Sequence, residues 1–147
     1  MNAIENIESV VYKMGKSKYG INLAFVAVLC LIFAILHQPL LVVLICAYSV
    51  LFEKNEWLNK HVLYTLIIMV CYMLVQFILS GTFGFLVWFI NLVGSDADIT
   101  ILYIGNIFSI IVRVLFILFY IFNAYIAATG KEVKSTFMNK LVSRISE

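Results

Sequence analysis

The chain has 147 residues, of which 64% are hydrophobic and 12% are charged, and its ten Lys and Arg against eight Asp and Glu give a net charge of +2. Soluble domains carry about 45–50% apolar and about 25% charged residues, so this composition excludes an ordinary water-soluble protein. The small positive surplus gives no indication of a nucleic-acid partner. We expect an integral membrane protein forming one domain over residues 1–147, with the lipid bilayer as its surroundings.

The sequence contains three apolar runs, residues 21–52, 62–93 and 101–128. A helix needs about 20 residues to cross a hydrocarbon core of about 30 Å, so the first run is too long for one crossing. His37 and Gln38 interrupt it, and Pro39 follows at a position suited to the first turn of a new helix. We predict a hairpin with arms at 21–36 and 39–52. The short arms leave open whether the hairpin spans the membrane or is re-entrant.

The second apolar run carries small residues, Ser80 and Gly84, in its middle. Glycine weakens a helix and allows another backbone to approach, so we predict a span over residues 59–80. Residues 82–94 either continue this helix after a kink or lie along the outer membrane interface, where Trp88 is favoured.

The fourth span is predicted to start near Asp96, because Ser95 and Asp98 have the spacing of a helix-capping pair. It extends through the third apolar run, so the transmembrane region covers 21–128. Segments 1–18 and 131–147 repeat apolar residues at three- and four-residue steps and predict amphipathic helices on the membrane surface. The expected fold is all-α, with four transmembrane helices and an amphipathic helix at each terminus.

Charge asymmetry supports this topology, since short cytoplasmic loops are enriched in Lys and Arg. With the N-terminus inside, four spans place nine basic residues inside and none in the outer loops: Lys13, Lys16, Lys18, Lys54, Lys60, Lys131, Lys134, Lys140 and Arg144. We therefore expect both termini to be cytoplasmic.

Arg113 lies near the centre of the last apolar run. An arginine at such a depth costs about 2.5–3.5 kcal/mol on insertion scales, and an intramembrane charge generally has a functional or structural reason. Gln76 should reach a similar depth and offer its carbonyl oxygen to the guanidinium. Three alternatives remain: a hydrogen-bond network or a partner's carboxylate, a polar cavity or anionic ligand such as a lipid phosphate, and a tilted helix that exposes Arg113 to an interface.

Other residues in the spans are candidates for helix association. Asn106 and Asn123 are predicted to form hydrogen bonds between helices or to a partner. Small residues four apart predict close helix packing at two pairs, Ser80 with Gly84 and Gly105 with Ser109.

Residues that would carry catalysis are not recognisable in the sequence. Cys30, Cys46 and Cys71 lie in apolar runs and are expected to be free thiols. His37 and His61 are predicted at opposite membrane faces, so we expect no metal site and no cofactor.

The charged loop preceding the second run includes Glu56, Trp57, Leu58, Asn59 and His61, and the last run exits through Gly130 and Lys131. With the proline-containing hairpin, these features resemble the small four-helix membrane proteins related to the chloroplast Tic-complex import subunit. The resemblance covers about residues 21–140. It implies a four-helix membrane fold and a generic accessory role, with no catalytic residues.

We expect a non-enzymatic accessory or assembly subunit of a larger membrane complex, of the transport, secretion or toxin-immunity type. Its partner would be another membrane protein or further copies of the chain, in a bacterial cytoplasmic membrane. The alternative is a homo-oligomeric channel or transporter in which Arg113 lines a polar or anion path.

Overall fold

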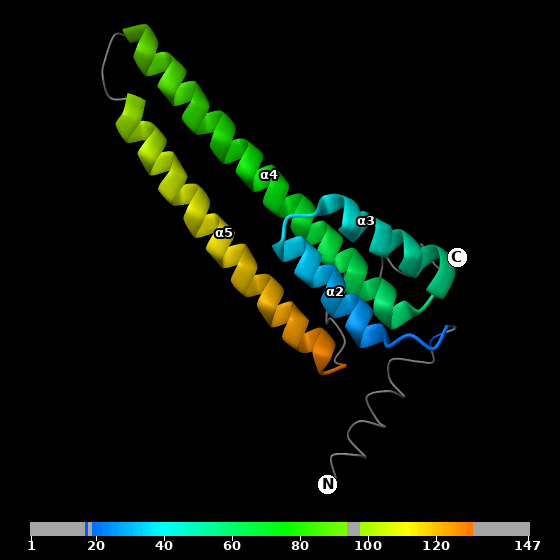
Figure 1. Cartoon of the computed structure of the whole chain (residues 1–147). Helices are drawn as coiled ribbons and strands as arrows, with labels where there is room; N and C mark the ends of the chain where they lie inside the picture. Colours follow the sequence, from blue (N-terminus) through cyan, green and yellow to red (C-terminus); the bar gives the residue numbers. More distant parts are fainter. Residues whose placement is uncertain (1–16, 18, 94–97, 131–147) are drawn as a thin grey trace. The chain divides into compact units, whose positions relative to one another are not determined.

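The computed structural model describes residues 17, 19–93 and 98–130, and every regular element in this part of the chain is helical. The predicted all-α class is confirmed. The elements are α2 (Leu23–Ile35), α3 (Pro39–Tyr48), the π-helical turn η1 (Ser49–Glu53), α4 (Glu56–Val93) and α5 (Asp98–Ala128) (Figure 1). Apart from Ser17, the predicted amphipathic segments 1–18 and 131–147 lie outside the described residues.

Two compact units make up the chain, one formed by residues 1–69 and 119–147 and the other by residues 70–118. Helices α4 and α5 each contribute residues to both units. The two units are described separately below.

The first unit begins with the predicted hairpin. Asn22 caps α2, since its side-chain oxygen accepts hydrogen bonds from the backbone N–H groups of Ala24 and Phe25 at 3.0 and 3.3 Å. The chain reverses at His37, whose φ of 54° is left-handed, and Pro39 occupies the start of α3. Proline lacks the backbone N–H that a first helical turn leaves unused, which explains why the return helix starts there.

The second arm ends at Glu53, one residue after the predicted Phe52. Helix α3 continues directly into η1, and the turn closes at Lys54, whose backbone is left-handed (φ 51°) and whose N–H donates to the Ser49 carbonyl at 2.8 Å. Helix α2 has 13 residues, and α3 with η1 forms one continuous helix over Pro39–Glu53, so each arm is about 20 Å long. Neither length reaches across a hydrocarbon core of about 30 Å.

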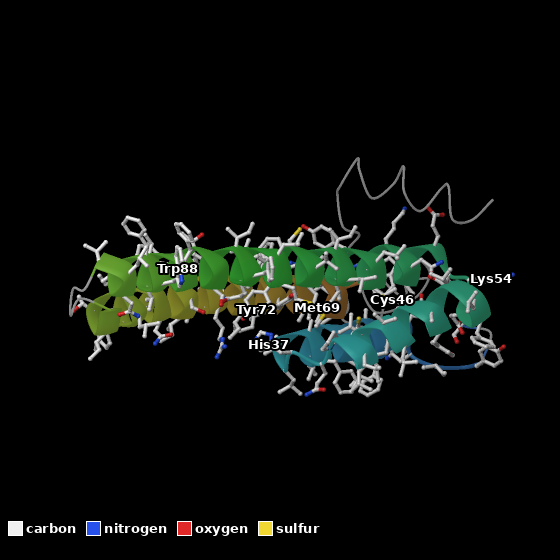
Figure 2. The ribbon with its side chains drawn as sticks, turned by 90° about the horizontal axis from the view of Figure 1, so that it is seen from above. His37, Cys46, Lys54, Met69, Tyr72 and Trp88 are labelled. Carbon is white, nitrogen blue, oxygen red and sulfur yellow. The ribbon has the colours of Figure 1, made fainter. Side chains whose placement is uncertain are left out.

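Helix α4 starts at the charged loop. The Asn55 side chain accepts a hydrogen bond from the Leu58 N–H at 3.1 Å and so caps the new helix. Cys46 of α3 lies against α4 and donates from its sulfur to the Val62 carbonyl at 3.2 Å (Figure 2). The core of the unit is formed by buried residues of α2 to α5: Leu23, Val26, Ala27, Cys30, Leu31, Ala34, Val42, Cys46, Trp57, Leu58, Val62, Ile68, Met69, Tyr120 and Ala127.

The second unit is an antiparallel pair made by the C-terminal part of α4 and the N-terminal part of α5. Tyr72 meets Phe116 edge to face with ring centroids 5.2 Å apart, and Phe83 meets Phe108 at 6.1 Å. These contacts fix the register of the two helices. Outside the contact stripe the side chains are mostly exposed and apolar, including Trp88 near the C-terminal end of α4 (Figure 2).

Of the two alternatives for residues 82–94, the structure has the continuing helix: α4 runs through Gly84 to Val93, beyond the predicted end of the span at Ser80. The following helix starts at Asp98, two residues after the predicted Asp96. In a membrane, leaving the helix would expose unpaired backbone groups to lipid, a penalty of several kcal/mol that exceeds the roughly 1 kcal/mol helix-weakening effect of a glycine.

Of the described helices, two are long and apolar enough to cross a membrane, α4 and α5, whereas α2 and α3 are shorter apolar helices. The prediction of four helices of spanning length therefore holds for two of them. Helix α4 has 38 residues and α5 has 31, which correspond to about 57 and 46 Å.

Candidate functional site

Arg113 lies in the second unit, on an exposed part of α5. Its neighbours Ile110 and Val114 are also exposed and apolar. Within the described part of the chain, the guanidinium forms neither a hydrogen bond nor an ion pair. Arg113 is therefore a cation on an apolar helix surface, and a packed position in the interior of this unit is excluded.

Gln76 forms hydrogen bonds with Ser109 and not with Arg113 as predicted. The Ser109 hydroxyl donates to the Gln76 side-chain oxygen at 2.7 Å, and the Gln76 amide donates to the Ser109 carbonyl at 3.3 Å. Ser109 precedes Arg113 by one helical turn and faces α4 directly. The glutamine oxygen expected to receive the guanidinium is thus used to join the two helices, a contribution of about 0.6 kcal/mol on average for such bonds.

The two predicted small-residue pairs behave differently. Gly105 lies directly under Phe83: a Cβ at residue 105 would be 2.7 Å from the Phe83 Cγ, so only glycine fits without a shift. At Gly84 a Cβ would meet nothing within 4 Å, and Ser80 is exposed. The pair Gly105 and Ser109 therefore packs helix against helix, whereas Ser80 and Gly84 are left open.

The open residues share one side of the helix pair. Successive residues of a helix point in directions that differ by about 100° around its axis. Viewed from the N-terminus of α4, Ser80 and Gly84 point about 60–100° clockwise of the residues that contact α5, Tyr72, Gln76 and Phe83. Viewed from the N-terminus of α5, Arg113 and Asn106 likewise point about 60–80° clockwise of the residues that contact α4, Gly105, Ser109 and Phe116. Because the helices are antiparallel, equal rotations bring both sets to the same side.

We call this side the Arg113 face and define it by Ser80, Gly84, Asn106 and Arg113. Asn106 and Arg113 are exposed, two turns apart on α5. The sequence had assigned these residues to two separate roles, polar partner binding and helix packing. The helix geometry instead places them on one side of the pair, where exposed apolar residues such as Phe77 and Ile110 also lie.

Asn123 belongs elsewhere. It is buried in the first unit and donates from its side-chain nitrogen to the Phe119 carbonyl of its own helix at 2.8 Å. The predicted hydrogen bond from Asn123 to another helix or a partner is thus replaced by a bond within α5.

A buried polar corner in the first unit was missed by the sequence analysis. It consists of five buried residues, Ser49, Glu53, Asn59, His61 and Thr65. Ser49 donates from its hydroxyl to the Asn59 side-chain oxygen, and Thr65 donates to the His61 carbonyl at 2.9 Å. The spacing of four residues from Trp57 to His61 to Thr65 was the available signal, because it places all three on one side of α4.

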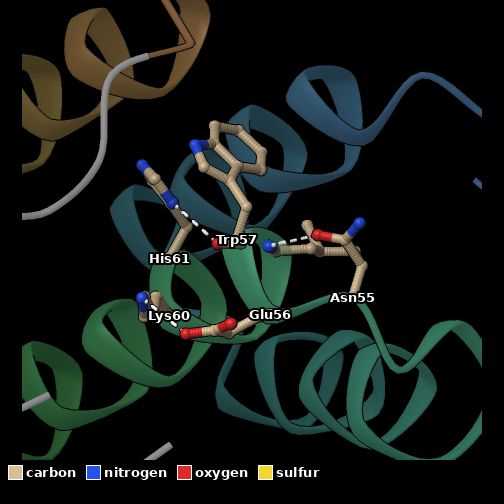
Figure 3. A network of polar contacts seen from close by, with 6 residues as sticks. Asn55, Glu56, Trp57, Lys60 and His61 are labelled. Carbon is tan, nitrogen blue, oxygen red and sulfur yellow. Dashed lines mark hydrogen bonds and ion pairs between the residues drawn. The ribbon is translucent and has the colours of Figure 1, made fainter. Parts of the chain in front are cut away.

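The side chains at the first turns of α4 project to different sides of the helix, with Trp57 and His61 on one and Glu56 and Lys60 on another (Figure 3). The rings of Trp57 and His61 lie side by side with centroids 4.2 Å apart, and the His61 Nδ1 donates to the Trp57 carbonyl at 3.0 Å. On the other side, Lys60 pairs with Glu56 at 2.8 Å. The loop that carried the family resemblance thus anchors the start of α4.

Metal chemistry gains no support from the described residues, among which no three His, Cys, Asp or Glu side chains are grouped to hold an ion. The three cysteines are free; Cys30 and Cys46 are buried and Cys71 is exposed.

We predict that Ser49→Ala lowers the free energy of unfolding by about 1–3 kcal/mol, because the buried Asn59 oxygen loses its donor. The double variant Ser49→Ala/Asn59→Leu should recover most of this loss, since both polar partners are then removed. Circular dichroism during denaturant unfolding in detergent micelles measures both effects. Equal stability of Ser49→Ala and the parent would contradict the assignment of this bond.

Comparisons with known protein families, with characterised proteins and with solved structures find no match to this chain.

Proposed function

We propose that this chain is a non-enzymatic membrane protein that serves as an accessory or assembly subunit of a larger membrane complex, in transport, secretion or toxin immunity. The observation that carries the proposal is the exposed Arg113 on an apolar helix. A charge within a membrane span costs about 2.5–3.5 kcal/mol on insertion scales and needs a compensating group. Since the described residues provide none, a partner protein is the source that we favour.

The proposed membrane arrangement has four membrane-embedded segments, with both termini on the cytoplasmic side of a bacterial membrane. In this arrangement α4 and α5 each cross the membrane, whereas α2 and α3 enter it from the cytoplasmic side as a hairpin. The basic residues Lys54 and Lys60 flank the start of α4, as expected of a cytoplasmic loop. An accessory role is also what the resemblance to the Tic-related membrane proteins implies.

Cysteine labelling tests this arrangement. In a Cys71→Ala background, a cysteine at Ala97 should react with a membrane-impermeant maleimide added outside intact cells. Cysteines at Asn55 and Ser135 should react only after permeabilisation. A cysteine at Gln38 should react more slowly than one at Ala97, because the hairpin arms are too short to reach the outer face. Reaction of the Asn55 variant in intact cells would refute the cytoplasmic position of this loop.

The assembly role is tested by extracting the protein in mild detergent from its native membrane and measuring its mass by native mass spectrometry. A complex containing a different membrane protein is the expected result. A stable assembly built only from copies of this chain would instead favour the second candidate.

The second candidate is a homo-oligomeric channel or transporter, favoured by the exposure of two polar residues, Arg113 and Asn106, on the same side of α5. In a ring of copies these side chains would line a polar path, and the positive charge would attract anions. Anion flux into liposomes containing the purified chain alone would support this candidate.

A further inference from the structure

We infer that the Arg113 face docks a transmembrane helix of a different protein, and that this helix carries an Asp or Glu side chain at the depth of Arg113. The inference rests on the proposed function and adds to it a surface and the chemistry of the partner. Three observations support it: the exposed charge of Arg113, the small residues on the same side of the helix pair, and the lack of Asp and Glu in the apolar runs of this chain.

Charge defines the group that must be present on the partner. A guanidinium in a membrane is best compensated by a carboxylate, which accepts two parallel hydrogen bonds from it. Arg113 forms no such pair within the described part of the chain. A second copy cannot supply the group, because the apolar runs 21–52, 62–93 and 101–128 contain neither Asp nor Glu. The carboxylate therefore belongs to another protein.

The small residues of the Arg113 face, Ser80 and Gly84, indicate that the partner is a helix. On the same side of the antiparallel pair as Arg113, but further along it and close to the level of Asn106, Ser80 and Gly84 leave a short part of α4 with little side chain, and a Cβ at Gly84 would meet nothing within 4 Å. Small residues allow a neighbouring helix to approach closely, and this close approach is a main source of association energy between helices in lipid. Fluid lipid chains require no such small residues. Asn106 adds a donor and an acceptor two turns from Arg113.

Site-specific photo-crosslinking in the native membrane tests the inference. A benzophenone amino acid is placed on the Arg113 face, at residue 84 or 106. Matched controls carry it two residues away, at residue 82 or 104, where Thr82 and Ile104 are exposed on the opposite side of the helix pair. The crosslinked peptides are then identified by mass spectrometry.

The expected product joins residues 84 and 106 to an apolar segment of another protein that contains Asp or Glu, with little product from residues 82 and 104. Arg113→Leu should lower its yield at least about tenfold, because the partner's carboxylate is left uncompensated. Arg113→Lys, which keeps the charge, should retain a substantial part. The double variant Arg113→Leu/Ile111→Arg moves the charge to the opposite side at nearly the same depth and should not restore the product.

Other outcomes overturn the inference in distinguishable ways. A crosslinked segment without an acidic residue, or equal yields from both sides, would refute this docking surface while keeping the subunit function. Crosslinks from all four residues only to lipid or to another copy of the chain would refute both.

Discussion

Arg113→Leu should release the partner protein from the detergent-solubilised complex and leave the chain itself folded. Removing one member of a buried ion pair strands the other, and the association should weaken by about 3–5 kcal/mol. Within the chain the substitution removes an exposed charge that has no partner among the described residues. The unfolding midpoint of the isolated chain should therefore stay constant or rise.

Recovery of the complex by affinity purification and thermal unfolding of the isolated chain separate the two effects. Arg113→Lys is the matched control, because it retains the charge but loses the planar, bidentate geometry. Intact assembly of Arg113→Leu together with loss of anion flux in liposomes would support the channel instead. No change in either measurement would show that Arg113 is merely tolerated.

Gly105→Leu should destabilise the contact between α4 and α5 by about 1–3 kcal/mol, the usual range for overpacking. Even the first side-chain atom would lie 2.7 Å from the Phe83 Cγ and 3.1 Å from its Cβ; the backbone fixes this Cβ, and the Cγ can move away only if the whole ring leaves its position. Unfolding of the purified chain in micelles, followed by circular dichroism, measures the loss.

Gly81 provides the control for this prediction, because it lies in the same helix pair and a Cβ there meets nothing within 4 Å. Gly81→Leu should leave stability unchanged or raise it by up to about 0.8 kcal/mol, since leucine is the better helix former. The combination Gly105→Leu/Phe83→Ala should lose less than the sum of its two single variants. Equal effects at Gly105 and Gly81 would show that the contact with Phe83 carries no energy.

The hairpin was predictable from the sequence because its signals are local. His37 and Gln38 interrupt an apolar run and Pro39 cannot continue a helix, so the predicted arm at 21–36 differs from α2 by two residues at its start and one at its end. The length of α4 was not predictable in the same way. Ser80 and Gly84 weaken the helix locally, but in a membrane the requirement for backbone hydrogen bonds would outweigh this effect.

For the site residues, the sequence indicates the depth along a helix but not the direction in which a side chain points around it. Counting residues along the spans placed Gln76 and Arg113 at similar depths, but it gave no information on which residue of α5 turns toward α4. Ser109 points toward α4, and its hydroxyl donates a hydrogen bond to the Gln76 side-chain oxygen. The polar corner around Asn59 was missed because its burial depends on the hairpin folding back onto the start of α4, a contact between segments that no local pattern encodes.

In the membrane arrangement proposed above, the lengths of α4 and α5 would also set how the chain responds to the thickness of the bilayer. The apolar part of α4, residues 62–93, corresponds to about 48 Å, whereas the hydrocarbon core of a bilayer is about 30 Å thick. Hydrophobic mismatch of this kind is relieved by tilting the helix or by locally thickening the lipid, at a cost that grows with each ångström. With α4 and α5 crossing as proposed, bilayer thickness would act on this chain directly, and lipids with longer acyl chains would match its helices better.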